Sequence, residues 1–138
     1  GANMIEELRE RTRGQVFTVL PFGNEVATLT VTGAELRSML ENGVSRMPSP
    51  DGRFPQISGL KVQFHCAGLS PVLDGVWKAP NGPGGPLTPL ADADTFRFVT
   101  NDFMYTGGDG YTVFGQGTNV QQPGDDLMQV ALDYICKG

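Results

Sequence analysis

A cluster of phenylalanine, glycine and aspartate in the last third of the chain has the residue types needed to hold a flat, polar ligand. Phe103 follows an apolar strand pattern, and Gly107, Gly108 and Asp109 come a few residues later. Glycine lets a ligand or another segment approach the backbone closely, and an aspartate offers two acceptor oxygens for hydroxyl groups. The same residues are also typical of a tight turn closed by an aspartate. This stretch by itself leaves both a binding pocket and a simple turn open.

A second candidate is Phe22, in the sequence Pro21-Phe22-Gly23-Asn24. Proline stiffens the backbone and glycine frees it, so this phenylalanine lies on a stiff corner of the chain. From these residues alone, its side chain is expected to fold back onto the core; the alternative is that it stays exposed. Two exposed aromatic side chains can clamp a flat ring. Stacking a base on an aromatic side chain contributes about 1–3 kcal/mol.

Groups for hydrolytic chemistry are few. His65 is the only histidine, and a lone histidine at a strand end is more often a hydrogen-bonded structural residue than a ligand. A two-metal hydrolase site normally draws several His, Asp and Asn ligands from one region. A serine hydrolase of the G-x-S-x-G type would need a motif that the sequence lacks. We therefore predict no catalytic residue and no metal site in this chain.

The two cysteines, Cys66 and Cys136, lie far apart in the sequence and have no C-x-x-C spacing. That spacing argues against a zinc ribbon or a thioredoxin-type site. Two interpretations stay open: a disulfide formed across the fold in an oxidising compartment, or two independent thiols.

Composition bounds the class of protein. The 138 residues are expected to form one domain, residues 1–138, and carry a net charge of −5 with 15 acidic against 10 basic residues. This charge argues against a nucleic-acid partner, since phosphate binding needs a basic face. No apolar run approaches the roughly 20 residues that span a bilayer, so no membrane span is expected.

Hydrophobic patterning predicts an α+β fold, a mixed β-sheet layered with about three helices. Strands are expected over residues 25–32, 56–64, near 76–78 and from 95 to 100. Helices are expected over 3–13, after the capping box of Thr32 and Glu35, and from Asp125 or Asp126 onward. The remainder of 67–86 is predicted to be a long irregular loop with room for a protein partner, and 115–124 a further loop.

The predicted core follows these periodicities. Residues expected on its inward faces are Ala27, Leu29, Val31, Leu36, Met39, Leu40, Val44, Leu60, Val62, Phe64, Leu127, Val130, Ala131, Tyr134 and Ile135. On the strand from 95 to 100, Phe96, Phe98 and Thr100 are expected to share one face.

Three segments together resemble a known family. VFTVLPFGNEVATLTVTGAEL (16–36), FPQISGLKVQF (54–64) and FVTNDFMYTGGDGYTVF (98–114) are similar, in order and spacing, to the C-terminal domain of secreted 5′-nucleotidases and UDP-sugar hydrolases. The resemblance covers nearly the whole chain. The family's N-x-G-G-I-R motif is not found in this sequence, so no residue is assigned its contacts.

The resemblance implies a division of labour. In this family a separate N-terminal metallophosphoesterase domain of the same polypeptide holds two divalent metal ions and performs hydrolysis. The C-terminal domain binds the nucleotide or nucleoside, without a cofactor of its own. By this resemblance Phe22 and Phe103 would sandwich the base, and Asp109, framed by Gly107 and Gly108, would hold the ribose hydroxyls.

Further expectations follow from the same resemblance. The isolated chain would be catalytically inactive, and the full-length protein would be extracytoplasmic: periplasmic, cell-surface or secreted. Two alternatives stay open, a domain of a 2′,3′-cyclic-nucleotide phosphodiesterase and a protein-binding module that retains only the fold.

Overall fold

Strand β1 (Val26–Thr32) lies at the centre of one sheet in the computed structural model, which describes residues 13–82 and 84–137. Alternation of apolar and polar residues turns Ala27, Leu29 and Val31 inward, and all three are buried. Strand β1 pairs antiparallel with β5 (Thr95–Asn101) and, on its other side, with β6 (Thr118–Gln121). On β5, Phe96, Phe98 and Thr100 share the inward face, as predicted.

The second sheet is built on a long hairpin. Strands β2 (Leu60–Ala67) and β3 (Ser70–Lys78) pair antiparallel, and β4 (Thr88–Pro89) adds a short third strand. Leu60, Val62 and Phe64 alternate with exposed residues on β2, as predicted.

The strand predicted near 76–78 is confirmed as the end of β3, but the irregular loop predicted for the remainder of 67–86 is wrong over residues 70–75, which belong to the same strand. Pro71 lies close to the start of the strand, where a missing N–H is tolerated. Gly75 leaves room for the Trp77 ring, because a Cβ at Gly75 would lie 2.5 Å from it. Both residues are compatible with strand pairing and with packing of the Trp77 ring. Composition alone therefore concealed this part of the strand.

Helix α3 (Gly33–Val44) begins with the predicted capping box. The Glu35 N–H donates to Thr32 Oγ1 at 3.2 Å, and the Thr32 N–H donates to Glu35 Oε2 at 2.6 Å. This exchange satisfies two of the N–H groups that a helix start leaves unpaired. The predicted face of α3 is buried in the core: Leu36, Met39, Leu40 and Val44.

The core joins both sheets to α3. Phe114 lies at its centre, with ring centroids 5.2 Å from Phe98 and 5.7 Å from Tyr111, both stacked. Tyr111 directly precedes the short 3-10 helix η2 (Thr112–Gln116), and Phe114 lies within it. This helix follows η1 (Gly108–Gly110) and the single-turn helix α4 (Asp102–Tyr105). The segment that carries the candidate ligand-binding residues is therefore anchored in the core by two rings.

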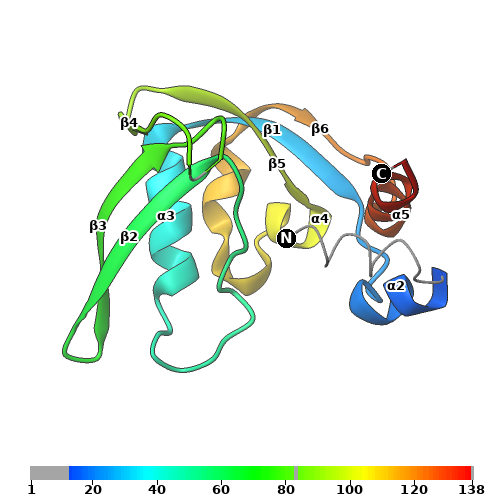
Figure 1. Cartoon of the computed structure of the whole chain (residues 1–138), viewed down its shortest axis with the longest axis horizontal. Helices are drawn as coiled ribbons and strands as arrows, with labels where there is room; N and C mark the ends of the chain where they lie inside the picture. Colours follow the sequence, from blue (N-terminus) through cyan, green and yellow to red (C-terminus); the bar gives the residue numbers. More distant parts are fainter. Residues whose placement is uncertain (1–12, 83, 138) are drawn as a thin grey trace.

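The first and the last helix of the described residues lie together. Helix α2 (Arg13–Val19) and helix α5 (Leu127–Lys137) are side by side at the end of the molecule opposite the β2–β3 hairpin, and β1 runs between these ends (Figure 1). Arg13 Nη1 donates to Gln129 Oε1 at 2.9 Å across the two helices. The helix predicted over 3–13 lies, except for Arg13, outside the described residues.

The C-terminal prediction is only partly correct. Asp126 accepts from the Gln129 N–H at 2.7 Å, so the aspartate caps α5 as expected. Leu132, which the predicted stripe omitted, is buried, whereas Val130 and Tyr134 are exposed. The predicted loop over 115–124 contains β6, whose exposed residues gave no alternating pattern because the strand covers no core.

The α+β class and the mixed layering are confirmed. Within the described residues, no helix is long and apolar enough to cross a bilayer.

Candidate functional site

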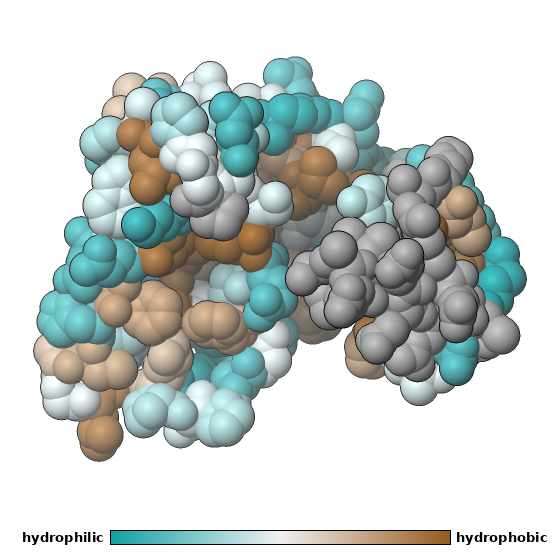
Figure 2. Space-filling view, viewed as in Figure 1, coloured by the Kyte–Doolittle hydropathy of each residue, from teal (hydrophilic) through white to brown (hydrophobic). Residues whose placement is uncertain are grey.

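Phe22, Phe103 and Asp109 line one pocket, with a volume of about 560 Å³. The pocket lies where the chain leaves α2 and where α4 and η1 follow β5, in a region between the two ends of the molecule (Figure 1). The surface is visibly hollowed between these ends (Figure 2). Four further residues of the described part of the chain line it: Asn24, Gly52, Asn101 and Met104.

Phe22 extends into solvent from its corner, with 82% of its surface exposed. Gly23 has a φ of +62°, a conformation that glycine adopts at no steric cost, so the chain reverses sharply after Phe22 and enters β1. The expectation that this side chain folds back onto the core is therefore wrong. One aromatic face is free to receive a flat ring.

The Phe103 ring lies close to the backbone of Gly108. Its ring is half-exposed, and a Cβ placed on Gly108 would lie 2.5 Å from the ring and 2.6 Å from the Phe103 carbonyl oxygen. Gly107, with a φ of +97°, makes the turn that brings Gly108 under the ring. The two glycines thus have separate roles, one conformational and one steric.

Asp109 occupies the left-handed region with a φ of +53°, where aspartate is more tolerated than most residues. Asn42 Nδ2 donates to the Asp109 carbonyl oxygen at 3.1 Å and fixes this turn against α3. Burial, and then the charge of Asp109, raise the pKa of Tyr111, whose hydroxyl donates to the Arg53 carbonyl oxygen. The GGDG segment is therefore both a tight turn and part of a pocket wall.

Among the described residues, the pocket lining carries one ionisable side chain, Asp109, and no lysine, arginine or histidine. Next to the lining, Asn24 Nδ2 donates to Asp102 Oδ1 at 2.9 Å, and this bond lowers the pKa of Asp102. A pocket with aromatic walls and a single carboxylate favours a neutral ring and hydroxyl groups over a phosphate.

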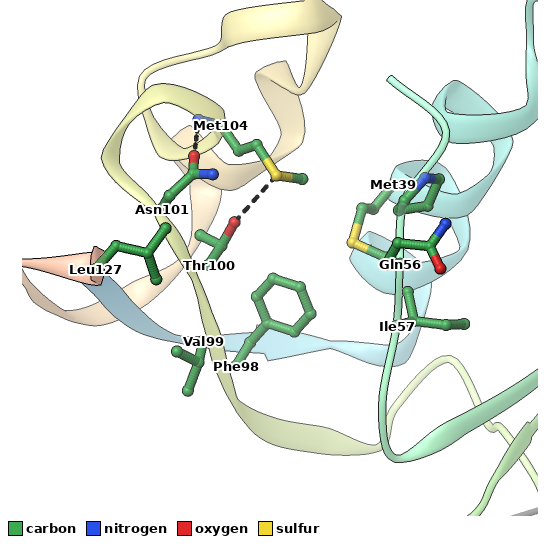
Figure 3. Close-up of a pocket in the computed structure, with 10 residues that line it drawn as sticks. Met39, Gln56, Ile57, Phe98, Val99, Thr100, Asn101, Met104 and Leu127 are labelled. Atoms are coloured by element: carbon green, nitrogen blue, oxygen red, sulfur yellow. Dashed lines mark hydrogen bonds between the residues drawn. The ribbon is translucent and has the colours of Figure 1, made fainter. Parts of the chain in front are cut away.

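A second, smaller cavity of about 290 Å³ adjoins this pocket and shares Asn101 and Met104 with it. It opens between the last residues of β5 and the segment that carries Gln56 and Ile57, with Met39 of α3 facing it (Figure 3). Its lining is mostly apolar. No residue of the predicted site lies in it.

Four lining residues were missed by the sequence reasoning. Asn24 and Asn101 stand inside the quoted PFGN and TNDF segments, so their side-chain amides were a readable signal. Met104 and Gly52 offered no comparable signal in the sequence. Gly52 is at the site because the loop folds beside Asp109: a Cβ at Gly52 would lie 3.9 Å from Asp109 Oδ2.

The other candidate residues lie away from the pocket lining. His65 Nδ1 is hydrogen-bonded to Asp74 Oδ1 at 2.7 Å, so it is a partnered strand residue, as predicted. Cys66 and Cys136 are both free and exposed, and the disulfide considered from the sequence is not formed. Among residues 13–82 and 84–137, no group of three or more His, Cys, Asp or Glu residues could hold a metal ion.

Comparison with known proteins supplies the family. Three similar proteins illustrate it. The chain is 35% identical over 125 residues to the trifunctional nucleotide phosphoesterase protein YfkN of Bacillus subtilis, covering 89% of this chain and 8% of that protein. It is 34% identical to the cell wall protein Lmo0130 of Listeria monocytogenes, over 91% of this chain and 15% of that protein. The crystal structure of a 5′-nucleotidase precursor from Thermus thermophilus superposes with a TM-score of 0.79 at 35% identity, over 92% of this chain and 25% of that one.

The chain thus spans a quarter or less of the length of each of these three proteins. A family profile described as "5′-nucleotidase, C-terminal domain" matches residues 10–116. The chain belongs to the 5′-nucleotidase C-terminal domain family.

Proposed function

We propose that this chain is the nucleotide- or nucleoside-binding specificity domain of a metal-dependent 5′-nucleotidase-type hydrolase. In this proposal the base lies between Phe22 and Phe103, and Asp109 accepts hydrogen bonds from the ribose hydroxyls. One observation carries it: Phe22, which is distant in sequence from Phe103 and Asp109, lines a single pocket of about 560 Å³ together with them. That volume falls within the usual range for small-molecule sites.

The chemistry of the lining supports a nucleoside in particular. Phenylalanine faces stack on any base because every base has a π-face. A carboxylate accepts from two neighbouring hydroxyl groups at once, which suits the ribose diol. Because none of the described lining residues is a cation, we expect the phosphate of a nucleotide to extend beyond them, toward a different part of the full-length protein. The names of two similar proteins, a nucleotide phosphoesterase and a 5′-nucleotidase precursor, agree with this class of ligand.

Hydrolysis is assigned in this proposal to two divalent metal ions held by an N-terminal metallophosphoesterase domain of the same polypeptide. The described residues of this chain do not fit such a centre, since they offer no cluster of metal ligands. We place the whole protein outside the cytoplasm, which agrees with a similar protein being named a cell wall protein. We expect the isolated chain to release no phosphate from AMP above buffer with Mn²⁺, Co²⁺ or Zn²⁺; turnover that increases with protein concentration would contradict this assignment.

The direct test is titration of the chain with adenosine, followed by amide chemical shifts. We expect the largest shifts at Phe22, Phe103 and Asp109 and at their sequence neighbours. Shifts spread over the β2–β3 hairpin instead, or no shifts at millimolar adenosine, would overturn the proposal.

Asp109→Asn is expected to lower the affinity for adenosine by about ten-fold. Asparagine tolerates the left-handed backbone of Asp109, so the turn is retained while the charge is lost. A net hydrogen bond to a charged group is worth about 1.5–3 kcal/mol, against about 0.5–1.5 for a neutral one. Calorimetry with 2′,3′-dideoxyadenosine is the control: its affinity should be nearly the same for both proteins. An equal loss for the two ligands would show that Asp109 does not act through the ribose hydroxyls.

A further inference from the structure

The two phenylalanines of the pocket lie on segments that part from each other at the end of one strand pair. Val26 and Asn101 form the last pair of the β1–β5 ladder. Beyond it, one chain runs back through Asn24 to Phe22, and the other runs forward through Asp102 to Phe103. Ladder hydrogen bonds therefore do not fix the relative position of the two rings, and other contacts must do so.

Asp102 makes these contacts. Its Oδ1 accepts from Asn24 Nδ2 at 2.9 Å and from the Glu25 N–H at 3.1 Å. Its own N–H donates to the Glu25 carbonyl oxygen at 2.9 Å. One residue thus joins the two segments by three hydrogen bonds, directly beside Phe103. Asp102 itself does not line the pocket.

Each side of this junction is also fixed to the rest of the fold. Asn101 Oδ1 accepts from the Met104 N–H at 2.8 Å, and the Thr100 hydroxyl donates to Met104 Sδ at 3.4 Å (Figure 3). The Thr106 N–H donates to the Asp102 carbonyl oxygen at 2.9 Å, which closes the turn around Phe103. This turn leaves Phe103 little freedom to move independently of Asp102.

The Phe22 side is attached to the start of α5. The Leu127 N–H donates to the Asn24 carbonyl oxygen at 2.9 Å, and the Val26 N–H donates to the Asp125 carbonyl oxygen at 2.8 Å. Asn24 therefore links α5 through its backbone and Asp102 through its side chain. Loss of the Asp102 carboxylate would leave the Phe22 corner attached to α5, and joined to the Phe103 turn only by the backbone hydrogen bond from the Asp102 N–H to the Glu25 carbonyl oxygen.

We propose that Asp102 is a positioning residue that sets the spacing of the Phe22 and Phe103 rings and so pre-forms the base slot. The inference rests on the proposed function, since it assumes that a base enters between these rings. Dispersion contacts weaken quickly when a gap of even 0.5–1 Å opens between surfaces. A slot already fixed at the right width also avoids the cost of ordering two side chains on binding.

The test compares adenosine binding by the wild-type chain, Asp102→Ala, Asp102→Ser and Asp102→Asn. Alanine and serine cannot reach Asn24, and we expect each to weaken binding by about five-fold, the equivalent of one lost net hydrogen bond. Asparagine keeps an oxygen that can accept from both Asn24 and the Glu25 N–H, so it should restore most of the affinity. Serine serves as the milder change if the alanine variant does not fold.

A spectroscopic signature separates positioning from general destabilisation. A base between two rings has its proton resonances shifted upfield, and these shifts should shrink for the adenine H2 and H8 protons in the alanine and serine variants. The matched control is Asp94→Ala, which removes another hydrogen-bonded carboxylate, at the far end of β5, where it accepts from Lys78 Nζ at 2.8 Å. We expect adenosine affinity and the upfield shifts to be unchanged in the control.

The outcomes are distinguishable. If the wild-type chain binds adenosine but Asp102→Ala or Asp102→Ser binds equally well with equal upfield shifts, the positioning role is overturned and the proposed function stands. A similar loss of affinity in Asp94→Ala would also overturn it, because the effect would then be general. If the wild-type chain does not bind adenosine at all, the proposed function is overturned and this inference with it.

Discussion

Replacement of Phe103 by alanine is expected to lower adenosine affinity by about ten-fold or more. The residue supplies one of the two aromatic faces of the pocket and is half-exposed before any ligand binds. Stacking of a base on an aromatic side chain is worth about 1–3 kcal/mol, and 1.4 kcal/mol is about a factor of ten in affinity. Isothermal titration calorimetry on both proteins measures the change directly.

A matched control is Phe54→Ala. Phe54 is exposed to a similar degree as Phe103, but it does not line the pocket, and its ring contacts Phe64 at a centroid distance of 6.4 Å. This control should retain the affinity for adenosine. If Phe103→Ala leaves nucleoside binding intact, the base clamp is wrong, and a module that retains only the fold for protein binding becomes the better interpretation.

Gly108→Ala is expected to destabilise the chain by about 1–3 kcal/mol, because over-packing of a tight site forces side chains or backbone to move. The added Cβ would lie 2.5 Å from the Phe103 ring and 2.6 Å from the Phe103 carbonyl oxygen. The ring could rotate away, but the backbone oxygen could not, so α4 or η1 must shift. Urea unfolding measures the free energy, and the ring resonances of Phe103 should change at the same time.

Gly115→Ala is the control for this substitution. Gly115 also lies in a 3-10 helix, and a Cβ there meets nothing within 4 Å. We expect its stability to stay within about 0.5 kcal/mol of the wild type. Equal stability of Gly108→Ala and wild type would show that Gly108 does not fit under the Phe103 ring as described.

Some elements of the fold could be predicted because local physics decides them. The Thr32–Glu35 capping box and the inward residues of β1 depend on spacings of two to four residues, and both occur as predicted. The end of β3 near 76–78 was predicted, but residues 70–75 of this strand were hidden, because their proline and glycine have roles that only the partner strand β2 and the Trp77 ring define. The exposed β6 has no buried face, and therefore no pattern to read.

The candidate site, too, could be predicted only in part. The residue types at Phe22, Phe103 and Asp109 indicated a binding function, and their motifs resembled a family to which the chain does belong. Gly52 could not be predicted as a lining residue, because only the folding of its loop beside Asp109 brings it to the pocket. The free thiols of Cys66 and Cys136 could not be predicted either, since bonding depends on a distance that spacing in sequence does not set.

The sequence by itself determined the family, the periodicity of β1 and α3, and three residues whose types suit a flat ring and hydroxyl groups. Tertiary structure decided that these residues share one pocket, that Gly108 supports the Phe103 ring, and that Asp102 joins the two segments that carry the rings. The reason is that the pocket depends on the register of β1 against β5, in which Val26 meets Asn101. Register between distant strands is fixed by packing of the whole core, and a local pattern contains no record of it.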